Sequence, residues 1–173
     1  MISEACAKII KKNIDEIFAL VFNGLQDEHA RVRYQALACL GLILNDTSPD
    51  LQNKFHATLM PQLFKMMHGE ELIKMKAQVV STTCSFVNGL MHLEDDEETE
   101  VTPKQKEDAK TIIDLYSQAL VENISALFNL AIEKQYAPLQ EETLALLNNL
   151  AESLKEKFAA YYSTFIPGMK QML

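Results

Sequence analysis

The chain has 173 residues, 48% of them hydrophobic and 23% charged, which is the composition of a folded domain large enough to bury a core. Sixteen basic and twenty-four acidic residues give a net charge of −8, so nothing supports electrostatic binding to nucleic acid. The longest apolar run, 36–44, is far shorter than the ~20 residues of a membrane-spanning helix, and Glu4 does not fit a secretory signal. Neither nucleic acid nor a membrane is expected as a partner.

The apolar pattern of the chain repeats at two distances. The spacing in 14–25 recurs 107 residues later in 121–132, and a shorter offset of 42 residues relates 17–25 to 59–67. Units of about 40 residues that contain two helices are typical of HEAT-type solenoids. The repeats therefore predict a stack of helix pairs.

The predicted fold is all-α, a superhelix (solenoid) of about three and a half antiparallel pairs of HEAT helices. A period of 3.6 residues predicts helices at 13–25, 30–45, 49–67, 71–90, 104–134 and 138–155. The chain, 1–173, is then a single solenoid fragment made of the end of a preceding inner helix (1–12), three repeats (13–45, 49–90, 112–155), an acidic insertion (91–111) and the first helix of a truncated repeat (158–173). Because polar capping repeats are missing at both ends, we expect it to be part of a longer array.

On the predicted inner helix 30–45, one apolar face contains Val32, Ala36, Leu40 and Ile43. The three cysteines of the chain are odd in number and widely spaced, which is typical of reduced thiols in a cytosolic or nuclear protein. Cys39 and Cys84 are expected to be buried on inner helices as small hydrophobic residues.

Motifs for catalysis are not found. The four histidines are scattered, and there is no His-Glu-x-x-His, glycine-rich phosphate loop or nucleophile elbow. Four tetrahedral metal ligands cannot be named, and the acidic stretch in 91–111 lacks the spacing of a calcium loop. We expect no enzyme activity, no metal and no cofactor. For the acidic stretch, a solvated insertion, a contact with a basic partner and a self-regulatory flap remain open.

Polar side chains form a stripe on the second and third inner helices. Stacked inner helices line the concave side of a solenoid, where such arrays hold partners. Amides can pair with an extended peptide backbone, and carboxylates attract lysine and arginine. The candidate partner-binding residues are Gln78, Thr82, Ser85, Asn88, Glu141, Glu142, Asn148, Asn149 and Glu152. An ordinary solvated face is the alternative for each of them.

Asp27 and Arg33 are expected to have a structural role. An acid in the turn within a helix pair and an arginine early in the inner helix can bond along the stack. Such contacts would form a ladder that fixes the angle between neighbouring repeats.

Several segments resemble the central HEAT repeats of the importin-β (karyopherin-β) family. They include Leu25-Gln-Asp-Glu-His-Ala-Arg-Val-Arg-Tyr-Gln-Ala, followed by Gln52-Asn-Lys-Phe-His56. Met1-Ile-Ser-Glu-Ala-Cys6 and Glu156-Lys-Phe-Ala-Ala-Tyr-Tyr-Ser-Thr-Phe-Ile-Pro167 are similar to the importin-5, or karyopherin-β3, branch of that family. The resemblance covers most of the chain outside 91–111.

The resemblance implies a nuclear transport receptor without enzymatic activity or cofactor. Such a receptor shuttles between cytoplasm and nucleus through the nuclear pore and carries basic cargo proteins with nuclear localisation signals. Ran-GTP releases the cargo, and outer-helix grooves bind Phe-Gly nucleoporins. Because the family's main Ran contacts involve N-terminal repeats, a complete transport cycle is not expected of this segment alone. The alternative is a HEAT-repeat scaffold of a phosphatase or chromosome-organising complex, which the hydrophobic pattern does not separate from a receptor.

Overall fold

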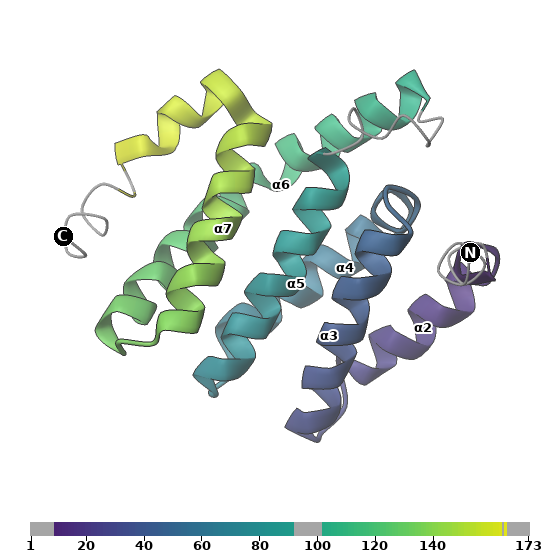
Figure 1. Cartoon of the computed structure of the whole chain (residues 1–173), viewed down its shortest axis with the longest axis horizontal. Helices are drawn as coiled ribbons and strands as arrows, with labels where there is room; N and C mark the ends of the chain where they lie inside the picture. Colours follow the sequence, from purple (N-terminus) through teal and green to yellow (C-terminus); the bar gives the residue numbers. More distant parts are fainter. Residues whose placement is uncertain (1–8, 92–101, 164, 166–173) are drawn as a thin grey trace.

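Antiparallel helix pairs stacked side by side make up the molecule (Figure 1). The computed structural model describes residues 9–91, 102–163 and 165. In this part of the chain every regular element is helical, and the elements are α2 (Ile14–Gly24), α3 (Ala30–Asp46), α4 (Asp50–Gly69), α5 (Ile73–Met91), α6 (Pro103–Glu133), α7 (Ala137–Leu154) and the 3-10 helix η2 (Lys155–Tyr161). The predicted all-α HEAT architecture is confirmed.

The helices lie in two layers. The inner layer contains α3, α5 and α7, and α5 packs against both of its neighbours. The outer layer contains α2, α4 and α6, each joined by a short turn to its inner partner (Figure 1). Because α2 and α7 lie at opposite ends of the stack, the layers remain open and do not close into a bundle.

Apolar side chains fill the space between the layers. The repeat anchors Leu25 and Met67, which the 42-residue offset relates, are each 1% exposed. On α3 the buried residues are Leu37, Leu40, Ile43 and Leu44. Val32, predicted on the apolar face with Leu40, is 43% exposed. Since each residue turns the helix by about 100°, the face centred on Leu37 and Leu44 is rotated away from Val32.

The start of α6 agrees within one residue with the helix predicted at 104–134. The acidic insertion predicted at 91–111 overlaps this helix, because residues 103–111 form its first turns. Thr102 and Gln105 make a capping box, in which the Gln105 amide N–H donates to Thr102 Oγ1 (3.3 Å) and the Thr102 amide N–H donates to Gln105 Oε1 (2.9 Å). Pro103 suits the first helical position because it has no N–H to leave unpaired.

Three predicted segments lie wholly or mostly outside the described residues. They are the end of a preceding inner helix at 1–12, the acidic stretch within 91–111 and the helix at 158–173. Of the last, the structure describes the turns of η2 and the buried Phe165, which is 3% exposed.

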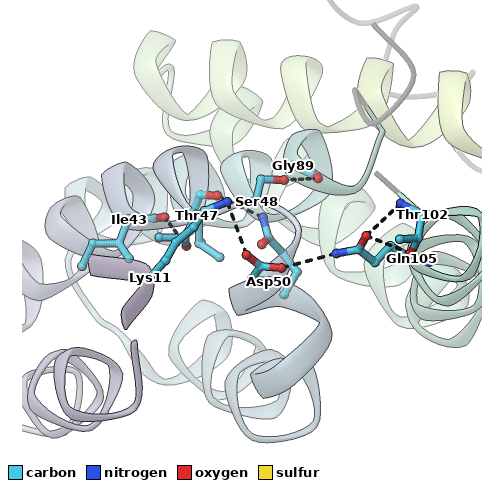
Figure 2. A network of polar contacts seen from close by, with 10 residues as sticks. Lys11, Ile43, Thr47, Ser48, Asp50, Gly89, Thr102 and Gln105 are labelled. Carbon is cyan, nitrogen blue, oxygen red and sulfur yellow. Dashed lines mark hydrogen bonds and ion pairs between the residues drawn. The ribbon is translucent and has the colours of Figure 1, made fainter. Parts of the chain in front are cut away.

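The turn between α3 and α4 connects the three helix pairs along one edge of the stack (Figure 2). Asp50, in the first turn of α4, lies 3.3 Å from Lys11 Nζ and accepts a hydrogen bond from Gln105 Nε2 at 3.5 Å. The hydroxyl of Ser48 donates to the carbonyl of Gly89 in α5. These polar contacts tie the start of α4 to the residues before α2 and to the start of α6.

Candidate functional site

The exposed side of α3, α5 and α7 is the candidate functional site, here called the inner-helix face. Contacts between neighbouring helices show which of their residues lie at the same height along the helix axes, here called a level. A Cβ atom at Gly41 of α3 would lie 3.6 Å from Ser85 Oγ of α5, and Asn149 Nδ2 of α7 lies 3.0 Å from Cys84 Sγ. Residues near 41, 85 and 149 therefore share one level across the three helices.

The four candidates on α5 are not all accessible. Thr82 is 1% exposed, and its hydroxyl donates to the carbonyl oxygens of Leu37 (3.0 Å) and Gln78 (2.9 Å). It holds α5 against α3, so its prediction as a partner-binding residue is corrected. Gln78, Ser85 and Asn88 are half-buried on the same side of the helix. The predicted stripe is thus rotated toward α3.

Two further residues of α5 belong to the inner-helix face. Lys74 is exposed, and its Nζ lies 5.1 Å from the centroid of the Tyr34 ring on α3. Ser81 is half-buried and follows Lys74 by two helical turns. Because seven residues make almost two full turns, Lys74, Ser81 and Asn88 share one face. Their spacing of seven residues was the signal in the sequence that could have identified Lys74 and Ser81 as part of this face.

On α7 the exposure agrees better with the predicted stripe. Glu141, Asn148 and Glu152 are exposed, and Asn148 Nδ2 donates to Glu152 Oε1 at 2.9 Å. Glu142 and Asn149 are half-buried. They lie one position further along the helix, which turns them toward α5. Partner binding by these residues stays a prediction.

The two described cysteines differ in environment. Cys39 is exposed on α3, contrary to the expected burial, because it lies away from the face that packs on the core. Burial raises the pKa of the half-buried Cys84 thiol to about 11, the charge of Glu142 raises it as well, and the hydrogen bond from Asn149 lowers it. Cys84 therefore stays a neutral thiol near pH 7 and takes part in the contact between α5 and α7.

Arg33 links the first helix pair to the second. Its Nε and Nη2 donate to Glu70 Oε1 and Oε2 at 2.6 and 2.8 Å, and this hydrogen bonding raises the pKa of Arg33. Its Nη1 donates to the carbonyl oxygens of Asp27 and Glu28, each at 2.9 Å. The two parallel bonds to Glu70 have the bidentate geometry that favours arginine over lysine.

Asp27 is not the acidic partner in this contact. Its carboxylate accepts a hydrogen bond from the His29 amide at 2.8 Å and closes the turn before α3. Glu70 lies in the corresponding turn of the second pair, so the repeat itself was the signal that identifies it. In the third pair this turn holds Lys134 and Gln135, so the acid is not repeated there.

A side chain early in each inner helix bonds a carbonyl group at the end of its outer helix or in the turn that follows. Nη1 of Arg33 does so in the first pair, the ammonium of Lys76 bonds the Met67 carbonyl in the second, and Gln140 Nε2 bonds the Ala131 carbonyl at 3.1 Å in the third. Burial lowers the pKa of Lys76. In the second and third pairs these bonds satisfy C-terminal carbonyl groups that have no partner within their own helix.

The described residues include a sizeable cavity but no cluster of candidate metal ligands. No group of three or more His, Cys, Asp or Glu side chains among them could hold a metal ion, and none of their helices is long and apolar enough to cross a bilayer. A cavity of about 560 Å³ lies between the end of α5, α6 and the turn after α7. Its one lining hydroxyl, on Ser153, donates to the Asn149 carbonyl at 2.8 Å, and no histidine or cysteine is among the described residues around it.

The comparisons with known proteins agree with this architecture. Residues 17–47, which include α3 and most of α2, match the HEAT repeat family. Over 171 residues, or 99% of its length, the chain is 26% identical to importin subunit beta-3 of Saccharomyces cerevisiae. The chain is thus similar to an importin beta-3 over nearly its whole length. It spans about 14% of the length of this relative.

The predicted resemblance to the importin-β family is confirmed over 99% of the chain, including residues outside the matched HEAT repeat. The relative is named as an importin subunit and not as an enzyme, which agrees with the predicted lack of catalytic activity. The relative is about seven times longer than the matched segment, so its name describes a much larger protein than the inner-helix face described here.

Proposed function

We propose that the chain is part of a HEAT-repeat nuclear import receptor and that its inner-helix face contributes to binding basic cargo proteins with nuclear localisation signals. The observation that carries this proposal is the similarity to importin subunit beta-3 over 99% of the chain. In the longer parent, Ran-GTP releases the cargo, and Phe-Gly nucleoporins guide passage between cytoplasm and nucleus. A pull-down of that parent with Ran loaded with GTP or GDP tests the control step through nucleotide-selective capture.

The chemistry of α7 supports a basic cargo. Glu141 and Glu152 are exposed and Glu142 is half-buried on the same helix, so three carboxylates lie on or beside the inner-helix face. Carboxylates at a surface attract lysine and arginine and speed their encounter with the protein. The net charge of −8 adds a long-range attraction that salt screens.

The test replaces Glu141, Glu142 and Glu152 together by glutamine. This variant removes three charges but keeps side chains of similar size and polarity. If each exposed carboxylate contributes about 0.5 kcal/mol, binding of a labelled lysine- and arginine-rich peptide should weaken by about tenfold at low salt. Fluorescence anisotropy with the intact chain measures the dissociation constant.

A matched control removes the same charge from the other layer. Glu107, Glu122 and Glu133 are exposed on the outer helix α6, and their replacement by glutamine should change the dissociation constant by less than about twofold. If both triple variants weaken binding equally, the peptide responds only to net charge, and the inner-helix face loses its role in cargo binding.

A further inference from the structure

Lysines are the most numerous charged residues around the cavity at the end of α5. The cavity has a volume of about 560 Å³ and lies between the end of α5, the first half of α6 and the turn after α7, at one end of these helices (Figure 1). Lys106 and Lys110 line it from α6, and Lys155 and Lys157 line it from the turn. In a chain with a net charge of −8, four of the sixteen basic residues thus surround one cavity.

The two lysines of α6 lie on one face of this helix. Lys106, Lys110 and Asp114 follow one another at intervals of four residues, so their side chains project from the same side. Glu107 and Asp108 are exposed as well, but steps of about 100° per residue turn them away from that side. The acidic residues in the first turns of α6 are therefore not part of the cavity lining.

An ion pair holds the turn after α7 against this face of α6. Lys157 Nζ donates to both carboxylate oxygens of Asp114, at 2.7 and 2.9 Å. Lys110 and Lys106 precede Asp114 by about one and two turns, or about 6 and 12 Å along the helix axis. The ion pair is therefore one wall of the cavity, and the two lysines of α6 continue the lining from it.

The carboxylates around the cavity do not balance its lysines. Three carboxylates, those of Asp114, Glu152 and Glu156, share the lining with the four ammonium groups. Asp114 is bonded to Lys157, and Glu152 accepts a hydrogen bond at 2.9 Å from Asn148 Nδ2 on the inner-helix face. The charge left to attract a ligand into the cavity is positive.

Lys155 lines the cavity in a strained backbone conformation. It follows α7 with φ 50° and ψ −123°, which glycine adopts readily and a residue with a Cβ atom rarely does. Strained residues of this kind cluster at sites that hold ligands. Glycine would end α7 without the strain, but it would remove an ammonium group from the cavity.

Apolar side chains form the floor of the cavity. Leu90, Ile113 and Leu154 are at most 7% exposed, and Met91 is half-buried. A cavity with an apolar floor and a few charged groups suits a ligand that joins an apolar group to groups of the opposite charge. A peptide segment in which an aliphatic side chain is next to aspartate or glutamate has this chemistry.

We propose that this cavity is a second interaction site of the chain and binds an acidic peptide segment of a partner protein. An aliphatic side chain of the segment lies on the apolar floor, and its carboxylates contact Lys106, Lys110 and Lys155. The segment has the opposite charge to the basic cargo of the proposed function, so this inference does not depend on that function. Salt screens the contacts with lysine and leaves the apolar contact.

The test uses the intact chain and three fluorescein-labelled peptides. The first peptide has leucine next to a run of glutamates, the second has glutamine in place of every glutamate, and the third has serine in place of leucine. We expect the first to bind about tenfold more tightly than the second at low salt, and about threefold more tightly than the third. Fluorescence anisotropy measures the dissociation constants, and equal values for the first two peptides would overturn the proposal.

A triple variant assigns binding to the cavity. Replacing Lys106, Lys110 and Lys155 together by glutamine should weaken binding of the first peptide about tenfold at low salt. Binding of a basic peptide should not weaken in this variant, which separates the cavity from the cargo site of the proposed function. If the variant binds the acidic peptide as tightly as the native chain does, the cavity is not the site.

A matched control removes three positive charges elsewhere. Lys54, Lys65 and Lys134 are exposed and do not line the cavity, and their replacement by glutamine should change the dissociation constant by less than about twofold. Equal losses in the two triple variants would mean that the acidic peptide responds only to net charge, and the proposed site would be wrong.

Lys155→Gly separates binding from packing. The midpoint of thermal unfolding should rise or stay unchanged, because the backbone strain is relieved, whereas binding of the first peptide should weaken by about two- to threefold at low salt. A merely structural role of Lys155 would not combine these two effects. If the glycine variant keeps the native affinity, Lys155 is not part of the site.

Discussion

Gly89 is a residue whose lack of a side chain lets two helix pairs approach. A Cβ atom at this position of α5 would lie 2.1 Å from Gln52 Nε2 and 2.7 Å from Ser48 Oγ. Gln52 is fully buried, and its Nε2 donates to the Leu44 carbonyl at 3.1 Å. Moving Gln52 away would break this bond and leave a buried amide unpaired, which costs free energy.

We therefore expect Gly89→Ala to lower the free energy of unfolding by about 1–3 kcal/mol, although alanine is the better helix former by about 1 kcal/mol. Urea denaturation followed by circular dichroism measures the change. Gly69→Ala is the control, because nothing lies within 4 Å of a Cβ atom at Gly69. If the two variants are equally stable, the close approach at Gly89 does not limit the packing.

At the scale of elements, the bond between Arg33 and Glu70 joins α3 to the turn before α5. The two side chains are 20% and 11% exposed, so water competes for their charges less than at the open surface. By contrast, Lys54 and Asp15 lie 2.7 Å apart with side chains 49% and 67% exposed. The two ion pairs thus have similar N–O distances, but the side chains of Arg33 and Glu70 are much less exposed to water than those of Lys54 and Asp15.

Arg33→Lys should destabilise the chain by about 1–2 kcal/mol, because an ammonium cannot reproduce the two parallel bonds to Glu70 together with the carbonyl contacts. Lys54→Gln should change the free energy of unfolding by less than about 0.5 kcal/mol, as is usual for exposed ion pairs. Chemical denaturation of both variants gives the comparison. Similar losses in the two would mean that the contact between the repeats contributes no more than an exposed ion pair.

For the whole molecule, stability should be graded along the stack. The central helix α5 packs against α3, α4, α6 and α7, whereas the main contact of α2 is with α3. In a solenoid each repeat is stabilised by its own fold and by its immediate neighbours. A helix with neighbours on every side therefore opens less readily than one at an end of the stack.

We expect amide hydrogen exchange to be at least about tenfold slower in the middle of α5 than in the middle of α2. Exchange followed by mass spectrometry of peptides from the native chain measures this difference. Both segments are α-helical, so a difference in exchange rate reports how readily each helix opens and not whether its amides are hydrogen-bonded. A uniform rate across the stack would show that the chain opens only as a single cooperative unit.

Hydrophobic spacing was enough to predict the fold class and the ends of most helices. The predicted helices 30–45 and 138–155 correspond to Ala30–Asp46 and Ala137–Leu154. The acidic insertion predicted at 91–111 overlaps the first turns of α6, because these turns are polar and Thr102 and Gln105 cap them through local hydrogen bonds. A periodic apolar pattern is a weak signal where a helix extends beyond the core.

The candidate face could be predicted only in part. Glu141 and Glu152 are exposed as expected, whereas Thr82 turns out to bind the Leu37 carbonyl inside the contact with α3. The 67% exposure of Leu42 could not be predicted either, because a leucine in an apolar run gives no sign that it faces solvent. One helix in isolation does not specify which of its polar or apolar residues a neighbouring helix will cover.

The amino-acid sequence by itself determined that the chain forms HEAT-type helix pairs, because helix formation and apolar periodicity are local properties. It also carried the importin resemblance, in residues that are contiguous along the chain. Only the tertiary structure decided that Glu70 and not Asp27 bonds Arg33, and that Thr82 lies buried against α3. Those pairings depend on the angle and level at which helices pack, which are set by many side chains at once.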